Sequence, residues 1–395
     1  MKNLLRLTLI SVALSGSLYA SEYSDLEAKV DALIEEIEAS KVETTDDELG
    51  GHHGHGDAMS KVYKKGGDKL SIGGYGHTDY VNNQGKDTDT ANNYRTILYL
   101  GYKFSDKIVF NSEIEFEHAN SIAMEFAAID FMINDALNFR AGNFLIPVGN
   151  INLRHEPTLF LNVSRPETER QIIPSTWSEN GFMVYGKNGN FEYTFAQTAS
   201  LNGYDSTNSK AFTSIRSMRS GASQSPANDF AYMARLSYTP IEGLELIASA
   251  FTGEVDQGVT AIDGSAVTIA EAHVLYNKNN INFTALYVQT KTDAADKLAV
   301  SAVADVASET SGYYATLGYV INQWTPFIHV ESYDKFGAGF DSTGNTKTKD
   351  AKTDALAFGV NYRPHKQVVI KADYMDQEVA GVSDDRFSMG VGYIF

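Results

Sequence analysis

Apolar and polar residues alternate with a period of two along most of this chain. In the last ten residues, RFSMGVGYIF, one face carries Phe387, Met389 and Val391, and the intervening positions are small or polar. Successive side chains of a β-strand point to opposite faces, so this pattern predicts a strand. A solvated terminus normally frays into a polar tail. We therefore expect the strand that ends at Phe395 to be held by a neighbouring strand.

The same alternation recurs at intervals from residue 69 onward. In RTILYLGYKF, Leu98, Leu100 and Tyr102 share a face opposite Arg95 and Tyr99. The runs are about ten residues long, which is the length that a tilted membrane strand requires. About sixteen such runs begin near residues 69, 93, 107, 121, 136, 179, 190, 229, 242, 267, 280, 310, 323, 354, 366 and 386.

The connections between these runs alternate in length. Short turns have the sequences FSDK, INDA, KNGN, TPIEG, NKNN, INQ and RPHK, and longer polar loops lie near 81–92, 148–178, 199–228, 254–266, 292–309, 336–353 and 377–385. Short turns on one side and long loops on the other are typical of bacterial outer-membrane barrels. The predicted fold class is all-β: a transmembrane antiparallel β-barrel of about 16 strands. Because unpaired strand edges are not tolerated in lipid, the last strand should close against the first.

A soluble β-sandwich is the competing interpretation, since its strands also alternate. Sandwich strands average about five or six residues, shorter than the runs in this chain. One residue fits a central strand poorly: Pro326 cannot donate a ladder hydrogen bond, so it should stand at a strand start or a bulge.

The region before the barrel divides into three predicted parts. Residues 1–20 have a basic start, an apolar centre and LYA before Ser21, which predicts a signal peptide. Residues 21–41 show apolar positions at heptad spacing, which predicts a periplasmic coiled-coil helix, with a single amphipathic helix as the alternative. Residues 42–68 are acidic and rich in Gly and His, so we expect a flexible linker. The barrel domain is then 69–395.

Composition excludes several classes of function. The formal net charge of -18 makes nucleic acid an unsuitable partner. There is no cysteine, so neither disulfides nor thiolate metal sites are available. The chain has no G-x-S-x-G, H-E-x-x-H or P-loop sequence, so we expect no enzyme activity and no cofactor.

Residues 124–181 resemble a known family. The pieces AAIDF, LNFRAGNFLIPVG and RPETERQIIPSTWSENG are similar to the region around the inward-folded third loop of trimeric outer-membrane porins of the phosphate-selective porin O and P superfamily. The resemblance implies a sixteen-stranded barrel, a homotrimer and a loop that constricts the lumen. It also implies that Tyr393 and Phe395 form the signal read by the barrel-assembly machinery, in an outer membrane of lipid and lipopolysaccharide.

The residues of this long connection agree with the resemblance. Between Val148 and Glu179 the chain contains Leu159, Phe160 and Ile172, and a long loop with so much apolar content should pack against something. Packing against the inner wall would narrow an otherwise open aqueous lumen.

Charged residues that reach the lumen would carry the function. The loop candidates for the pore constriction are Arg154, His155, Arg165, Glu167, Glu169 and Arg170. The wall candidates, chosen by inward parity, are Arg95, Lys103, Glu113, Glu115, Glu117, Arg140 and Lys371. Glu125 and Asp130 fall on opposite faces unless a bulge intervenes.

Three functions remain open at this point. Bases on one side and acids on the other would give a transverse field, as in a pore for passive diffusion of small hydrophilic solutes. If Arg140, Arg154, Arg165 and Arg170 lined one path, anions such as phosphate or carboxylate would be favoured, because guanidinium groups match these ions. A structural or adhesive barrel with a plugged lumen is the third. Equally, the charges of RPETER could brace the loop without touching solute.

A last candidate is the sequence HHGHG in the predicted linker. His52, His53 and His55 could bind a transition metal ion. Holding three ligands in a Gly-rich segment has a high entropic cost, so this metal site is not a firm prediction.

Overall fold

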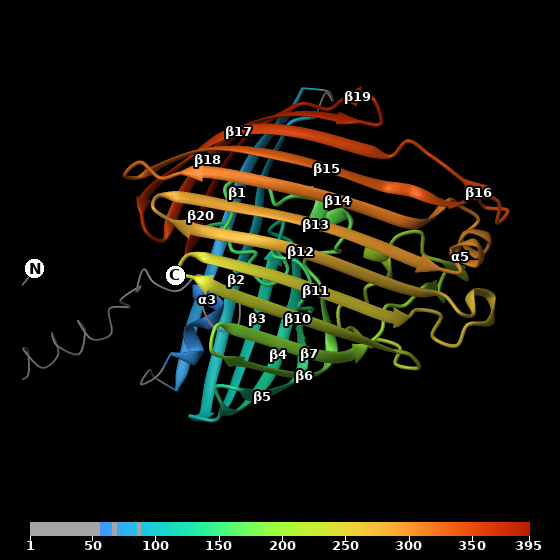
Figure 1. Ribbon diagram of the computed structural model, residues 1–395, viewed down its shortest axis with the longest axis horizontal. Coiled ribbons are helices and arrows are strands. Elements are labelled where there is room, and N and C mark those ends of the chain that lie inside the picture. Colours follow the sequence, from blue (N-terminus) through green and yellow to red (C-terminus); the bar gives the residue numbers. More distant parts are fainter. Residues whose placement is uncertain (1–55, 65–68, 85–87) are drawn as a thin grey trace, which may run out of the picture. The chain divides into compact units, whose positions relative to one another are not determined.

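The computed structural model describes residues 56–64, 69–84 and 88–395 (Figure 1). Within these residues sixteen long antiparallel strands form one closed barrel. Its first eight strands are β1 (Leu70–Asn83), β2 (Thr90–Ser105), β3 (Ile108–Glu117), β4 (Ser121–Asn134), β5 (Leu137–Leu145), β6 (Ser178–Asn188), β7 (Phe191–Ala199) and β10 (Phe230–Ile241). The other eight are β11 (Leu244–Glu254), β12 (Ala266–Lys278), β13 (Ile281–Asp293), β14 (Val306–Tyr319), β15 (Trp324–Phe340), β17 (Lys352–His365), β18 (Val368–Val379) and β20 (Arg386–Ile394).

Short helices and strands lie before β1 and in the connections between the long strands. They are α3 (Asp57–Ser60), η2 (Lys61–Tyr63), α4 (Glu167–Gln171), β8 (Tyr204–Asp205), β9 (Lys210–Ala211), η3 (Ile215–Met218), η4 (Thr260–Ile262), α5 (Ala295–Ala302), β16 (Thr346–Lys347) and β19 (Val382–Ser383). Among the described residues, no helix is both long enough and apolar enough to cross a membrane.

The barrel closes where its last strand meets its first. Strand β20 pairs with β1 in an antiparallel ladder that runs from Tyr75 opposite Ile394 to Asn83 opposite Arg386. Beyond this ladder, the amides of Phe395 and Gly74 each donate to the other residue's carbonyl, at 2.9 and 3.1 Å. The backbone at the chain end is therefore fully paired, which confirms the expectation drawn from the apolar C-terminal sequence.

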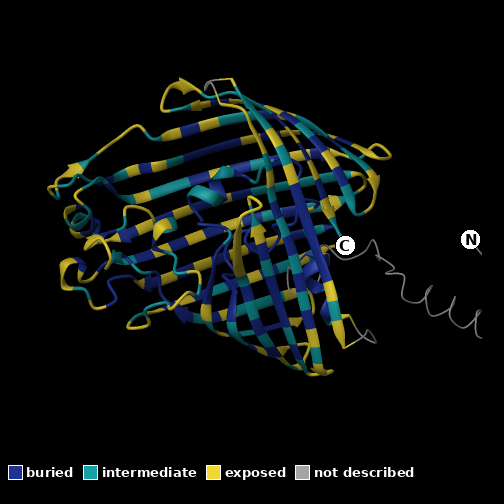
Figure 2. Cartoon of the chain, turned by 180° about the vertical axis from the view of Figure 1, so that it is seen from behind, coloured by how far each residue is buried: buried dark blue, intermediate teal, exposed yellow. Residues whose placement is uncertain are grey.

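Burial alternates along the strands, and the exposed side is the apolar one (Figure 2). In β17, Phe358 is 54% exposed on the outside, while Ala357 and Asn361 are fully buried inside. Phe195 of β7 and Met389 of β20 likewise point outward. An outer surface of this kind is typical of contact with hydrocarbon, whereas a soluble sandwich would bury these side chains.

The predicted strand starts lie close to the observed ones. The largest difference is at β14, which was expected near residue 310 and begins at Val306. Pro326 is the third residue of β15, opposite Val360 of β17 and beyond the end of the β14 ladder. The proline thus stands at a strand start, where a missing donor is tolerated.

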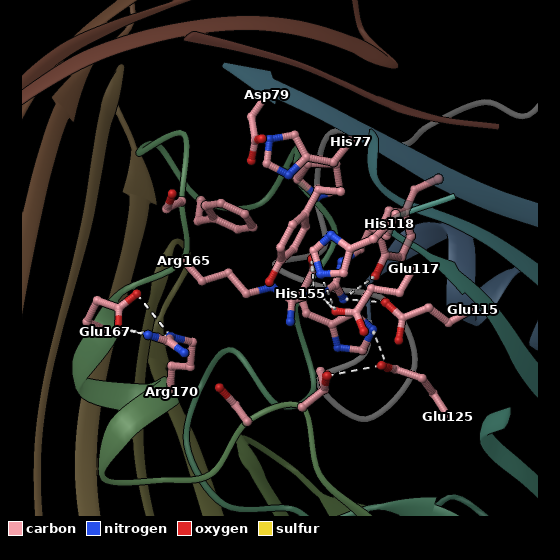
Figure 3. A pocket seen from close by; sticks show the side chains of 18 of the residues that line it. His77, Asp79, Glu115, Glu117, His118, Glu125, His155, Arg165, Glu167 and Arg170 are labelled. Atoms are coloured by element: carbon pink, nitrogen blue, oxygen red, sulfur yellow. Dashed lines mark hydrogen bonds and ion pairs between the residues drawn. The ribbon is translucent and has the colours of Figure 1, made fainter. Parts of the chain in front are cut away.

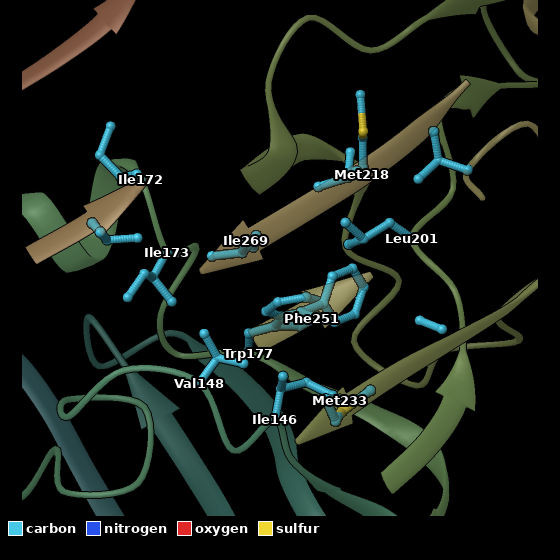
Figure 4. Packing of buried hydrophobic residues seen from close by; sticks show 14 of the residues in the cluster. Ile146, Val148, Ile172, Ile173, Trp177, Leu201, Met218, Met233, Phe251 and Ile269 are labelled. Atoms are coloured by element: carbon cyan, nitrogen blue, oxygen red, sulfur yellow. The ribbon is translucent and has the colours of Figure 1, made fainter. Parts of the chain in front are cut away.

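The loop between β5 and β6, residues 146–177, packs against the inner wall, and we call it the constriction loop. Its apolar side chains join those of β6, β10, β11 and β12 in a buried cluster (Figure 4). Trp177 lies at the centre, with its ring 4.8 Å from that of Phe251 between centroids. The connection after β7, residues 200–229, adds Leu201 and Met218 to the same cluster. We call this region the apolar half of the lumen.

The prediction of a flexible linker is wrong for residues 57–63, which belong to the described part of the chain. Residues 57–63 are helical, and Met59 and Val62 are 1% and 2% exposed against the inner wall of the first strands. Asn111 of β3 donates to the carbonyl of Met59 at 2.9 Å, and Tyr63 donates to Asp130 of β4 at 2.6 Å. Gly-rich flanks suggested flexibility, but the sequence AMSKVY carries apolar side chains that are buried against the wall.

The signal peptide, the coiled-coil helix and the three linker histidines lie outside the described residues.

Candidate functional site

A cavity of about 470 Å³ lies between the constriction loop and the inner wall of β1 to β4 (Figure 3). Its lining contains five arginines, five carboxylates and three histidines. The arginines are Arg95, Arg165, Arg170, Arg216 and Arg219; the acids are Asp79, Glu115, Glu117, Glu125 and Glu167; the histidines are His77, His118 and His155. We call this space the constriction cavity.

Asn152 joins the two ends of the constriction loop. Its side-chain amide donates to the carbonyls of Ile146 and Trp177 at 2.6 and 2.9 Å, and its oxygen accepts from the Trp177 amide at 2.6 Å. Asn152 is fully buried, so all three bonds form away from water. The carbonyls of Ile146 and Trp177 also accept from the amides of Val148 and Ile146, so the Trp177 amide is the backbone group that depends on the Asn152 side chain.

The wall holds the middle of the loop through charged groups. Lys371 donates to the carbonyls of Phe160 and Asn162 at 2.6 and 2.9 Å, and Asp373 accepts from the Val163 amide at 2.6 Å. Lys371 is 1% exposed and does not line the constriction cavity. The structure therefore places this predicted wall residue behind the loop, where it fixes the loop backbone.

Glu169 has a similar bracing position. Its carboxylate accepts from the amides of Asn150 and Ile151 at 2.9 and 2.7 Å and from the hydroxyl of Tyr314 at 2.7 Å. The pKa of Glu169 is raised to about 7, chiefly by burial and also by nearby Glu271, against the opposing effect of the three hydrogen bonds. Glu169 was predicted to line the constriction. It is instead fully buried and absent from the lining of the constriction cavity.

The loops contribute most of the positive charge of the cavity. Arg165 donates to the carbonyl of His155 at 3.2 Å, and Arg216 donates to the carbonyl of Ser175 at 2.5 Å. Arg219 donates to the carbonyls of Pro174 and Thr176. Burial, together with the charge of Arg216, lowers the pKa of Arg219 to about 10, which leaves it protonated at neutral pH.

The wall contributes most of the negative charge. Glu115 and Glu117 lie on the inner face of β3, and Asp79 lies on β1. Glu125 reaches the cavity because β4 has a bulge: Glu113 pairs with Phe126, whereas the next residue, Ile114, pairs with Met124. Glu125 and Asp130 were expected to share a face only if a bulge lay between them. That bulge is present, and Asp130 is also buried on the inner side.

The remaining charges of the cavity are paired within their own side. Arg95 contacts Glu115 at 3.2 Å, both on the wall, and Arg170 binds Glu167 at 2.6 Å, both on the loop. Among the described residues, the arginines bonded only to carbonyls therefore lie on the loops, and Asp79, Glu117 and Glu125 face them from the wall. In Figure 3, Arg165 and Arg170 stand opposite Glu115, Glu117 and Glu125.

Two further predicted arginines lie elsewhere. Arg154 lines a second cavity of about 270 Å³, with Thr158 and Arg363, toward the short turns, and it pairs with Glu245 at 3.6 Å. Arg140 binds Asp130 at 2.8 Å beneath the helical segment 57–63. Arg140, Arg154, Arg165 and Arg170 thus do not line one path.

The last three predicted residues are Lys103, His155 and Glu113. Lys103 donates to the carbonyl of Lys64 near the end of β2, away from the constriction cavity. His155 and Glu113 contact each other at 3.1 Å at the edge of that cavity, and both are buried.

Sequence reasoning missed five of the arginines, carboxylates and histidines in the lining: His77, Asp79, His118, Arg216 and Arg219. His77 and Asp79 share the inward parity of β1 and could have been found from the alternation. Arg216 and Arg219 lie in a connection that was interpreted only as a polar loop. Both arginines donate to backbone carbonyls of the constriction loop. This contact depends on packing between segments far apart in the chain.

One relative establishes a family for this chain. No protein-family model matches it. An uncharacterized protein of Aquifex aeolicus (strain VF5) is 32% identical over 377 residues, which cover 87% of this chain and 83% of the relative. The chain belongs to the same family as this Aquifex protein.

Solved structures of bacterial outer-membrane proteins share the fold of this chain. The outer membrane channel DcaP of Acinetobacter baumannii is 11% identical, with a TM-score of 0.57 over 88% of this chain and all of that one. OmpT of Vibrio cholerae, solved in a trimer form, is 11% identical, with a TM-score of 0.52 over 82% of this chain and 99% of that one. Salmonella typhi OmpF, in complex with daunomycin, is 13% identical, with a TM-score of 0.52 over 83% and 98%. At these low identities, the structural similarity shows the barrel fold alone. The resemblance to the phosphate-selective superfamily stays a prediction.

Proposed function

We propose that this protein is an outer-membrane porin whose constriction cavity passes small hydrophilic solutes and ions by passive diffusion. The supporting observation is the separation of charge across the cavity: carbonyl-bonded arginines on the loops face carboxylates on the wall. A field across a narrow aqueous passage orders a polar solute as it sheds part of its hydration, and it needs no nucleotide or cofactor. The solute gradient supplies the driving force.

The proposal includes an assembly and a location. The exposed apolar outer face suits the lipid and lipopolysaccharide of a Gram-negative outer membrane, with the N-terminal segment in the periplasm. Tyr393 and Phe395 point outward at the closing strand, where the barrel-assembly machinery could read them. The trimer form of the structural neighbour OmpT supports a homotrimer here.

An anion-selective channel is the second candidate. The observation that favours it is that Arg165, Arg216 and Arg219 bond to carbonyls rather than to carboxylates among the described residues, so their charge faces solute. Guanidinium groups bind carboxylate and phosphate well. The five carboxylates of the same lining weaken this candidate and favour the diffusion pore.

Single-channel recording in planar bilayers tests both candidates. We expect a large ohmic conductance, and a shift of the reversal potential toward cations when Arg165, Arg216 and Arg219 are all replaced by Ala. One charge at about 7 Å in water is worth about 0.6 kcal/mol, which changes local ion concentration about threefold, so the permeability ratio should change at least that much.

A matched control removes the same charge from exposed positions outside the constriction cavity, by replacing Lys210, Lys335 and Lys349 with Ala. This control should leave the reversal potential nearly unchanged, because exposed charges are screened by salt. A saturating conductance blocked by micromolar anion would favour the anion-selective channel. No conductance at all would instead support a plugged, structural barrel.

A further inference from the structure

Three side chains from three segments converge at the edge of the constriction cavity. Glu113 comes from β3, Glu125 from the β4 bulge and His155 from the constriction loop. The Nε2 atom of His155 lies 3.1 and 3.3 Å from the two carboxylate oxygens of Glu113 and 3.7 Å from Oε2 of Glu125. The side chains of Glu113 and His155 are fully buried, and that of Glu125 is 10% exposed.

The hydrogen bonding of this cluster is incomplete. The Nδ1 atom of His155 lies 3.2 Å from the carbonyl of Asn152, which can only accept, so Nδ1 carries the hydrogen. In the neutral ring, Nε2 then directs a lone pair at carboxylate oxygens that are themselves acceptors. Oε2 of Glu125 is buried and receives no hydrogen bond from the described part of the chain. Three electron-pair donors therefore face one another, and a positive species between them would resolve the conflict.

The spacing of the three groups fits a metal ion. Nitrogen and oxygen ligands about 2.0 to 2.2 Å from a tetrahedral Zn²⁺ lie about 3.3 to 3.6 Å apart. The contacts of 3.1 to 3.7 Å bracket this spacing, and one ligand atom from each of the three residues lies within 4.8 Å of the others. A histidine that binds metal usually donates its other N–H to a backbone carbonyl, as His155 does to Asn152. The hydroxyl of Thr176 donates to the other oxygen of Glu125 at 3.0 Å and so fixes the carboxylate.

We propose that Glu113, Glu125 and His155 bind one divalent first-row transition cation of the Zn²⁺ type. Imidazole and carboxylate ligands suit such ions, and three protein ligands leave a fourth position for water or solute. Glu125 and His155 line the constriction cavity, so the ion enters from the lumen. The bound ion joins the loop to β3 and β4.

The ion also changes the charge of the passage. Arg95, Arg165 and Glu115 are the other charged groups that line the cavity nearby. Two added positive charges beside Arg95 and Arg165 favour anions over cations. This consequence rests on the proposed channel function, whereas cation binding itself does not.

Binding is measured first, on the full chain purified in detergent. His52, His53 and His55 are replaced by Ala in every protein, so that the linker cannot bind the probe. Equilibrium dialysis against ZnCl₂ should then give one Zn²⁺ per chain. His155→Gln and, separately, Glu125→Gln should each weaken binding at least tenfold, because each removes a ligand. His365→Gln, at an exposed turn, is the matched control and should bind as the parent does.

Two binding results would overturn the proposal: no stoichiometric Zn²⁺ on the parent, or undiminished binding by both ligand variants. Heat-modifiable mobility on gels establishes which variants are folded. If His155→Gln does not fold, Glu125→Gln decides, since Gln keeps the size of the side chain and the Thr176 contact.

Reversal potentials form the second arm. Zn²⁺ should shift the parent toward anions and leave Glu125→Gln unshifted. Zn²⁺ binding without any shift in a conducting channel would overturn the effect on selectivity. If the protein does not conduct, the proposed function fails, and dialysis still decides the metal site.

Discussion

The two halves of the lumen differ in what fills them. In the apolar half, the constriction loop and residues 200–229 pack Ile146, Val148 and Trp177 against the inner wall. In the other half, the same loop presents Arg165 and Arg170 to a cavity lined by charged groups. A porin lumen is expected to be polar, so a hydrophobic cluster inside it calls for a reason.

The difference assigns separate tasks to the two faces of one loop. Apolar packing is strong and not directional, so it can hold a long segment in place without using the charges that face solute. The charged half then needs only short-range braces, such as the hydrogen bonds of Lys371 and Asp373 to the backbone of residues 160–163. This arrangement predicts that damage to the apolar half affects stability and pore size together, whereas damage to the polar half affects selectivity or local order.

The largest effect should come from Trp177→Ala in the apolar half. Trp177 is 2% exposed and its ring packs at a tilt against that of Phe251, so truncation should cost about 3 to 5 kcal/mol of unfolding free energy. A loosened loop should also raise single-channel conductance. Urea unfolding of the lipid-folded protein and bilayer recording measure the two effects.

Trp324→Ala is the matched control for this prediction. Trp324 is 50% exposed at the start of β15, outside the lumen. It should lose much less stability and leave the conductance unchanged. Equal losses in the two variants would show that the apolar half has no special role in anchoring the loop.

A pH effect of intermediate size should come from Glu169, whose carboxylate joins residues 150 and 151 of the constriction loop to Tyr314 of the wall. Its pKa is raised to about 7 in the folded state, against 4.5 as the ordinary value. The folded state therefore binds more protons than the unfolded state between these pH values, so this group's stabilising contribution is full below pH 4.5 and is lost as pH rises through 7. The change should be about 3 kcal/mol.

Urea midpoints measured from pH 4.5 to 8 test this contribution. Glu169→Gln cannot titrate, so its midpoint should fall less steeply with rising pH than that of the parent. A control at the exposed Glu242→Gln should retain the parent slope. Identical slopes in all three proteins would mean that Glu169 titrates as it does in water.

The smallest effect should come from Tyr63→Phe beneath the polar half. The Tyr63 hydroxyl donates to Asp130 at 2.6 Å and accepts from Arg140 at 3.2 Å. Loss of this hydroxyl should remove about 1 to 2 kcal/mol of the free energy that holds residues 57–63 against the wall. The segment should therefore detach from the wall more often. Protease cleavage within this segment should accelerate, whereas barrel stability should change little.

Tyr80→Phe is the control for the segment. The Tyr80 hydroxyl bonds Asp89 at 2.9 Å in an exposed position, so its removal should change neither cleavage nor stability measurably. Unchanged cleavage in Tyr63→Phe would show that the segment is held without the Tyr63 hydroxyl.

Local pattern determined the barrel and the inward parity of its residues. Glu115 and Glu117 could be assigned to the lumen from sequence because the pleat of a strand fixes every second side chain. The strand count and closure followed from the lengths of the runs and turns, since a sheet in hydrocarbon must pair every backbone group.

Only the tertiary structure decided which charges meet. Arg154 and Arg165 stand eleven residues apart in one loop yet line different cavities, because the loop folds over its apolar side against Phe251 and its neighbours. Glu125 enters the cavity through a one-residue bulge, and Arg216 arrives from a separate connection. Such contacts depend on the packing of segments distant in the chain, which no local period encodes.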